Sequence, residues 1–328
     1  MTGTTGTDTV LQPMASPEKP ETRRPARIAA MSAYAVALAL WTELLGLPND
    51  TVQIFLWLWL GTIAWNVDAP WRYHLGFLRD WWLPVLGLIV YFYSRGLTDE
   101  LGLPVHVTMP IHADEWLMGL LGVHDTTPTQ QLQAAWCGEP CLKTSEPRWY
   151  DVFFTTVYAS HFLAGLTIAA VLWVRNRAAW VQWMRRYLLI NYGALVIYIV
   201  YPMAPPWMAS EEGFLGPVTR ISSRGWHDIG LGRFDLVLQG VGNPVAAMPS
   251  LHAGITFLIA GYAVQKMRSP WRWMLLLYPL AMCVTLVYSG EHYVVDVLAG
   301  GALAGVVLAG SSWWERRHPP RPAMSTTA

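Results

Sequence analysis

The stretch Val294–Trp313, VVDVLAGGALAGVVLAGSSW, decides the fold. A helix needs roughly 20 mostly apolar residues to cross the hydrocarbon core of a bilayer, and this stretch has that length with one ionisable side chain, Asp296. Its LAGGALAG segment is rich in small residues, which allow two helix backbones in a membrane to approach closely. The stretch therefore predicts a transmembrane helix that packs tightly against a neighbour.

The rest of the chain has the same character. Hydrophobic residues make up 53% and charged residues 13% of the 328 residues, whereas soluble domains carry about 25% charged residues. We therefore expect an all-α, polytopic membrane protein with about eight transmembrane helices. The seven other candidate spans are Ile28–Leu47, Val52–Val67, Trp81–Tyr93, Val152–Val174, Tyr187–Tyr201, Ala246–Val264 and Trp273–Tyr288.

Charge predicts the orientation. With eight spans and a cytoplasmic N-terminus, most of the 22 Lys and Arg residues fall on cytoplasmic segments, as the positive-inside rule requires. Both termini are then cytoplasmic in a multi-pass plasma membrane protein. The low Lys content beside abundant Arg, Ala and Gly is typical of a bacterial, high-GC source. The formal net charge is zero, so no nucleic acid partner is expected.

The predicted spans divide the chain into five parts. They are a disordered cytoplasmic tail (1–27), N-terminal transmembrane helices (28–95), an extracytoplasmic loop with an interfacial helix (96–149), a catalytic membrane core (150–314) and a cytoplasmic tail (315–328). The interfacial helix is expected in HADEWLMGLLG of the loop. Cys137 and Cys141 lie in the same loop, where an oxidising environment favours a disulfide over two free thiols.

Ionisable residues within or beside the predicted spans include His161, His252, His292 and Asp296. Such groups are costly in a membrane and are functional candidates for that reason. His252 begins the sixth span and His292 precedes the eighth, so both are predicted at the outer boundary. Two histidines distant in sequence thus come to the same depth on the same side.

The residue types and spacings fit phosphoryl transfer. Asp296 follows His292 by four positions and can accept a hydrogen bond from one ring nitrogen, which leaves the other as a nucleophile. His252 follows Ser250 at a helix start, where backbone N–H groups can bind an anion and the histidine can protonate a leaving oxygen. Positive charge over the phosphoryl oxygens can come from outer-loop arginines or from the end of the third span. The candidates are Arg220, Arg224, Arg233 and Arg95.

Simpler interpretations stay open for several of these residues. His161 is equally interpreted as a hydrogen-bonded core histidine or as a proton relay or substrate contact. Ser250 can cap a helix and contact phosphate at once. Arg224 and Arg233 can be solvated loop charges.

The segments MPSLHAG (Met248–Gly254) and TLVYSGEHYVVDVLAG (Thr285–Gly300) resemble the second and third signature motifs of the type 2 phosphatidic acid phosphatase superfamily. YPMAPPW at Tyr201–Trp207 resembles its inositol phosphorylceramide synthase branch, the aureobasidin-sensitive enzymes. The resemblance covers about 150–310. It implies a six-helix catalytic core with two added N-terminal helices and no metal or other cofactor. It also implies a phosphohistidine on His292, which Asp296 orients, with His252 as the acid.

The chain departs from the family pattern in two places. The first motif, a Lys and an Arg ahead of Pro, is not visible, and Leu286 stands where an Arg usually precedes the nucleophile. The synthase branch shows the same kind of loss. We therefore expect Arg220 to replace a missing phosphate-binding cation.

These features together predict an enzyme that transfers a phosphoryl or phospho-head group, for example inositol phosphate, between lipid substrates in the outer leaflet. A phosphatase that hydrolyses a phosphatidic acid-type or polyprenyl phosphate-type lipid is the alternative, because both reactions use the same covalent intermediate. A non-catalytic lipid-binding or transport protein is a third interpretation, and the sequence leaves the oligomeric state open.

Overall fold

The computed structural model describes residues 23–46, 48, 51–97, 102–144, 146–227, 243 and 245–318, and no β-strand occurs among them. The helices are α1 (Arg24–Leu45), α2 (Thr51–Trp65), α3 (Trp71–Leu97), α4 (Thr108–Gly119), α5 (Pro128–Trp136), α6 (Trp149–Arg175), α7 (Arg177–Val200), α8 (Pro206–Glu211), α9 (Arg224–His227), α11 (Leu251–Lys266), the 3-10 helix η3 (Pro270–Leu276), α12 (Leu277–Tyr288) and α13 (Val294–Arg317). The chain is an all-helical, polytopic membrane protein.

Five segments are long and apolar enough to cross a membrane: α1, α3, α6, the combined η3–α12 and α13. Helix α2 is apolar but has 15 residues, and α11 has 16. Each of the eight predicted apolar stretches overlaps a helix, although 246–250 of the sixth stretch precede α11, and the number of spans stays a prediction. The third stretch is longer than predicted, because α3 already begins at Trp71 and continues through Pro84.

Aromatic side chains fill the interface of α3, α6 and α7. Trp81, Trp173 and Trp183 are fully buried, and Phe77 stacks on Trp81 with ring centroids 4.7 Å apart. Large rings bury much apolar area in a fixed geometry, so they hold these long helices in register.

Helices α11 and α13 cross closely at two glycines. A Cβ on Gly254 would lie 3.2 Å from the carbonyl oxygen of Gly300, and a Cβ on Gly300 would clash with the carbonyl oxygen of Ser250. The backbone N–H of Ser250 donates to the carbonyl oxygen of Asp296 across the same crossing (2.9 Å). The close packing predicted from LAGGALAG is confirmed.

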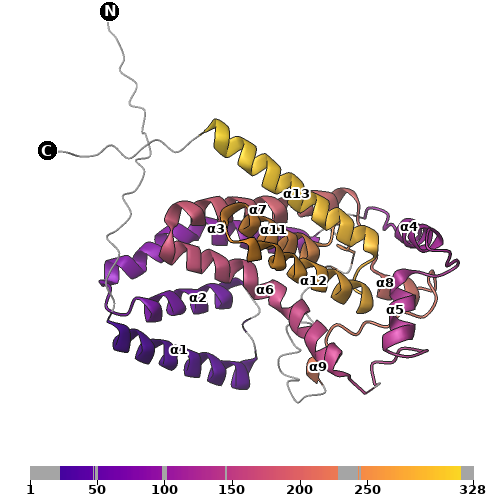
Figure 1. The fold of residues 1–328 in the computed structure, drawn as a ribbon, viewed down its shortest axis with the longest axis horizontal. Coiled ribbons are helices and arrows are strands. Elements are labelled where there is room, and N and C mark those ends of the chain that lie inside the picture. The colour runs from indigo at the N-terminus through magenta and orange to yellow at the C-terminus, as the bar shows by residue number, and fades with distance from the viewer. Residues whose placement is uncertain are drawn as a thin grey trace, which may run out of the picture.

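The short helices α4, α5, α8 and α9 gather at the end of the bundle where α13 begins (Figure 1). The predicted disulfide between Cys137 and Cys141 is confirmed. The Gln133 side chain of α5 donates to the carbonyl oxygens of Thr219 (2.7 Å) and Tyr288 (3.0 Å). These bonds fasten the segment before α9 to the end of α12, beside the turn that carries His292.

Candidate active site

The α11–α13 crossing brings the two motif histidines together. The rings of His252 and His292 have centroids 5.6 Å apart. Nδ1 of His292 lies 3.3 Å from Oδ2 of Asp296, which also accepts the backbone N–H of Tyr293 (2.9 Å). A proton on Nδ1 leaves Nε2 with a free lone pair, so Asp296 can both orient the ring and prepare Nε2 for attack.

A third histidine extends this pair. His161 of α6 lies with its ring centroid 4.3 Å from that of His252, and the Tyr158 ring stacks on that of His252 with centroids 4.8 Å apart. Nε2 of His252 and Nδ1 of His161 are buried with no hydrogen-bond partner among the described residues. Buried polar atoms normally have partners, so two such nitrogens on neighbouring rings suit a site that receives a substrate or exchanges protons.

The turn before α13 is held from several sides. Gly290 adopts a left-handed backbone (φ 76°), and a Cβ there would meet the carbonyl oxygen of Thr219 at 3.1 Å, so glycine is required. Its carbonyl oxygen accepts the backbone N–H of Trp207 (3.2 Å), from the YPMAPPW segment. The path of the chain into His292 is therefore fixed by contacts with α8 and with the segment that precedes α9.

Arg220 lies beside this turn. Its Nε donates to Oε1 of Glu291 (2.7 Å), which also accepts from the Ser222 hydroxyl (2.6 Å). The Arg220 guanidinium also lies 5.1 Å from the ring centroid of Trp207. Burial lowers the pKa of Arg220, but Glu291 and Tyr158 raise it above its ordinary value. A permanent cation thus stands next to the residue that precedes His292.

Arg224 has a different environment. Its Nη2 donates to Oδ2 of Asp151 (2.6 Å), and both side chains are 3% exposed. The same guanidinium contacts the Tyr288 hydroxyl (3.3 Å) and Sγ of Cys137 (2.8 Å). It is therefore not a solvated loop charge but part of a buried network between α6, α9, α12 and the disulfide loop. Arg233 lies outside the described residues.

Ser250 is fully buried and directly precedes α11. Its hydroxyl accepts the backbone N–H of Ala253 (3.4 Å), and its own N–H is occupied by Asp296 as described above. The geometry is that of a helix N-cap at the crossing. Contact with phosphate stays a prediction.

Arg95, at the end of α3, brings a second cation to the histidines. Its charge acts on His161, His252 and Tyr158. A residue from the N-terminal part of the chain thus contributes to the electrostatics of the site.

Sequence reasoning missed Asp114 of α4. This carboxylate is fully buried and accepts backbone N–H groups from Val294 (3.0 Å) and Val295 (3.2 Å) at the start of α13. The pKa of Asp114 is raised to about 7, chiefly by burial and in smaller part by the charge of Asp296, against the two N–H groups that lower it. The sequence feature that could have indicated this role is the spacing of Asp114, three positions after Ile111. That spacing puts it on the same face of the predicted interfacial helix as Ile111, which packs inward.

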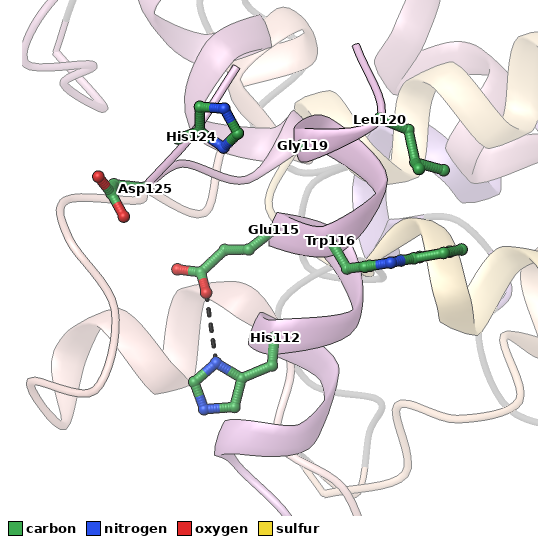
Figure 2. Close-up of a pocket in the computed structure, with 7 residues that line it drawn as sticks. All are labelled: His112, Glu115, Trp116, Gly119, Leu120, His124 and Asp125. Carbon is green, nitrogen blue, oxygen red and sulfur yellow. Dashed lines mark hydrogen bonds and ion pairs between the residues drawn. The ribbon is translucent and has the colours of Figure 1, made fainter. Parts of the chain in front are cut away.

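Other residues of α4 line a pocket of about 510 Å³ (Figure 2). It is lined by His112, Glu115, Trp116, Gly119, Leu120, His124 and Asp125, and His112 pairs with Glu115 at 3.3 Å. None of the candidate site residues lines it, so the chemistry of the histidines does not take place there. Within the described ranges, no three His, Cys, Asp or Glu side chains are grouped to hold a metal ion.

Comparisons with known proteins bear on the same region. A family model described as PAP2 superfamily matches residues 138–310. The chain is 28% identical over 173 residues to the phosphoinositol dihydroceramide synthase of Bacteroides thetaiotaomicron, covering 49% of this chain and 56% of that protein. It is 33% identical over 131 residues to the inositol phosphorylceramide synthase catalytic subunit aur1 of Schizosaccharomyces pombe, covering 37% and 30%. The chain thus spans about half of one relative and under a third of the other, and no solved structure matches it.

Proposed function

The chain belongs to the PAP2 superfamily, and we propose that it is a membrane-embedded lipid phosphotransferase that works through a phosphohistidine on His292. One observation carries the proposal. Two histidines 40 positions apart in sequence lie with ring centroids 5.6 Å apart, and Asp296 contacts only the one that would attack. A nucleophile, its orienting carboxylate and a second acid–base group are the parts that this reaction needs.

The two half-reactions balance as follows. Nε2 of His292 attacks the phosphorus of a lipid phosphodiester, the bond from phosphorus to the lipid oxygen breaks, and His252 protonates that oxygen. A lipid hydroxyl then gives its proton to His252, its oxygen bonds to phosphorus, and the bond to His292 breaks. Arg220 and Arg95 would stabilise charge on the phosphoryl oxygens, and His161 would exchange protons with His252.

The names of the two relatives indicate the substrate class. Both are synthases of inositol phosphate-bearing ceramide-type lipids, so we infer transfer of a phosphoinositol head group to a lipid alcohol. The same residues beside the histidines serve transfer to a lipid alcohol and transfer to water. A transferase therefore also has to exclude water from the site. We further propose that the site faces the outside of the plasma membrane and that both termini are cytoplasmic, because this orientation places most Lys and Arg residues inside.

The test is a phosphorus balance on purified protein in bilayer nanodiscs, with an inositol phospholipid donor and a ceramide or other lipid alcohol as acceptor. Formation of a new inositol phospholipid that needs the acceptor and is lost in His292→Ala is the expected result. Release of inorganic phosphate from lipid phosphate monoesters, also lost in His292→Ala, would make the protein a phosphatase. Turnover that survives in His292→Ala would overturn the mechanism.

A further inference from the structure

Helix α4 reaches the first turn of the helix that follows the nucleophile. The first N–H groups of any helix have no partner within it. In α13 the first two, on Val294 and Val295, donate to the two carboxylate oxygens of Asp114, which lies 180 positions earlier in the chain. The Asp114 side chain that accepts these hydrogen bonds is fully buried.

The sequence around His292 does not supply this cap. The N-cap position is Tyr293, whose side chain makes no capping hydrogen bond. The nearest carboxylate, Asp296, already accepts from Nδ1 of His292 and from the N–H of Tyr293. If Asp296 also had to satisfy the first turn, it would be drawn away from the nucleophile.

The contact is more than a pair of hydrogen bonds. Tyr293 is fully buried and packs in one cluster with Ile111, one turn before Asp114 on α4. Helix α4 therefore holds both the side chain and the backbone of the residues that directly follow His292.

We propose that Asp114 is a positioning residue for His292: it caps α13 from outside so that Asp296 is kept for the nucleophile. This inference rests on the proposed function. Asp114 does not contact the reacting atoms, and it lies outside the 138–310 region matched by the family model.

Three variants test the proposal. Asp114→Ala removes both acceptor oxygens, Asp114→Asn keeps one, and Glu115→Ala removes the neighbouring carboxylate, which faces the cavity of Figure 2 and pairs with His112. We expect kcat to fall about 10- to 100-fold in Asp114→Ala, since a nucleophile displaced by about an ångström loses on that order of rate. KM for the lipid donor should stay within about twofold, Asp114→Asn should lie between, and Glu115→Ala should match the wild type. A kcat for Asp114→Ala equal to that of Glu115→Ala would overturn the proposal.

A second readout does not depend on activity. Hydrogen–deuterium exchange of the peptide that holds Val294 and Val295 should be faster in Asp114→Ala than in Glu115→Ala, because the cap is lost. Unchanged exchange would overturn the role of Asp114 even if the wild type proved inactive on every lipid. Faster exchange in a wild type without transferase activity would instead leave the cap standing and refute the proposed function.

Discussion

Replacing Gly300 by Ala tests how far the site depends on the α11–α13 crossing. The added Cβ would lie 3.1 Å from the carbonyl carbon of Ser250 and 3.2 Å from the N of Gly254, and closer still to the carbonyl oxygen of Ser250. Ordinary contacts begin at 3.4 Å, and the neighbours are backbone atoms that cannot rotate away. The two helices must therefore part by on the order of 1 Å, and such overpacking costs about 1–3 kcal/mol.

The same displacement separates the two histidines. His252 lies in the first turn of α11 and His292 just before α13, so a parting of about 1 Å should lower kcat by on the order of 10²-fold. The matched control is Gly305→Ala on the same helix, where nothing lies within 4 Å of the new Cβ. Alanine should gain about 1 kcal/mol of helix propensity at either position, so the difference between the variants isolates the clash. Thermal unfolding and turnover in nanodiscs measure both effects, and equal values for the two variants would refute the reasoning.

Three further predictions follow from other parts of the site. Arg220→Ala should lower kcat by on the order of 10²-fold, because one charged hydrogen-bond donor is lost, and Arg220→Lys should retain part of the activity. Full activity in Arg220→Ala would exclude Arg220 as the phosphate-binding cation. Asp151→Asn leaves the buried Arg224 without its carboxylate and should lower the free energy of unfolding by about 3–5 kcal/mol; an unchanged thermal midpoint would contradict the buried ion pair. Because folding raises the pKa of Asp114 from 3.8 to about 7, its contribution to stability is complete below pH 3.8 and is lost as the pH rises through 7. The thermal midpoint of Asp114→Asn should lack that part of the decline between pH 4 and 8, whereas parallel curves for variant and wild type would contradict it.

The proximity of His252 and His292 was predictable from residue spacing together with the expected membrane topology. The four-residue spacing of His292 and Asp296 is visible in the sequence, and the charge distribution puts His252 and His292 at the same membrane boundary. The small residues around Gly300 likewise predict the close helix crossing. Each of these inferences uses the spacing of residues on a helix or the length and charge of a membrane span, and both can be recognised in a short stretch of sequence.

The side-chain pairings between residues far apart in sequence were not predictable. Arg220 and Arg224 are only four positions apart, yet Arg220 pairs with Glu291 beside the site and Arg224 is buried against Asp151. Asp114 reaches a helix that begins 180 positions later. Such pairings depend on how the outer segments fold over the bundle, and neither periodicity nor charge counting contains that information.

The most direct test of the account is to trap the covalent intermediate. Wild-type protein, His252→Ala and His292→Ala would be mixed with a donor lipid labelled at phosphorus, quenched in alkali to preserve phosphohistidine and digested for peptide mapping. The account predicts label on the peptide that contains His292 in the wild type and none in His292→Ala. Label on another residue, or product formation by wild-type protein without any labelled peptide, would contradict it.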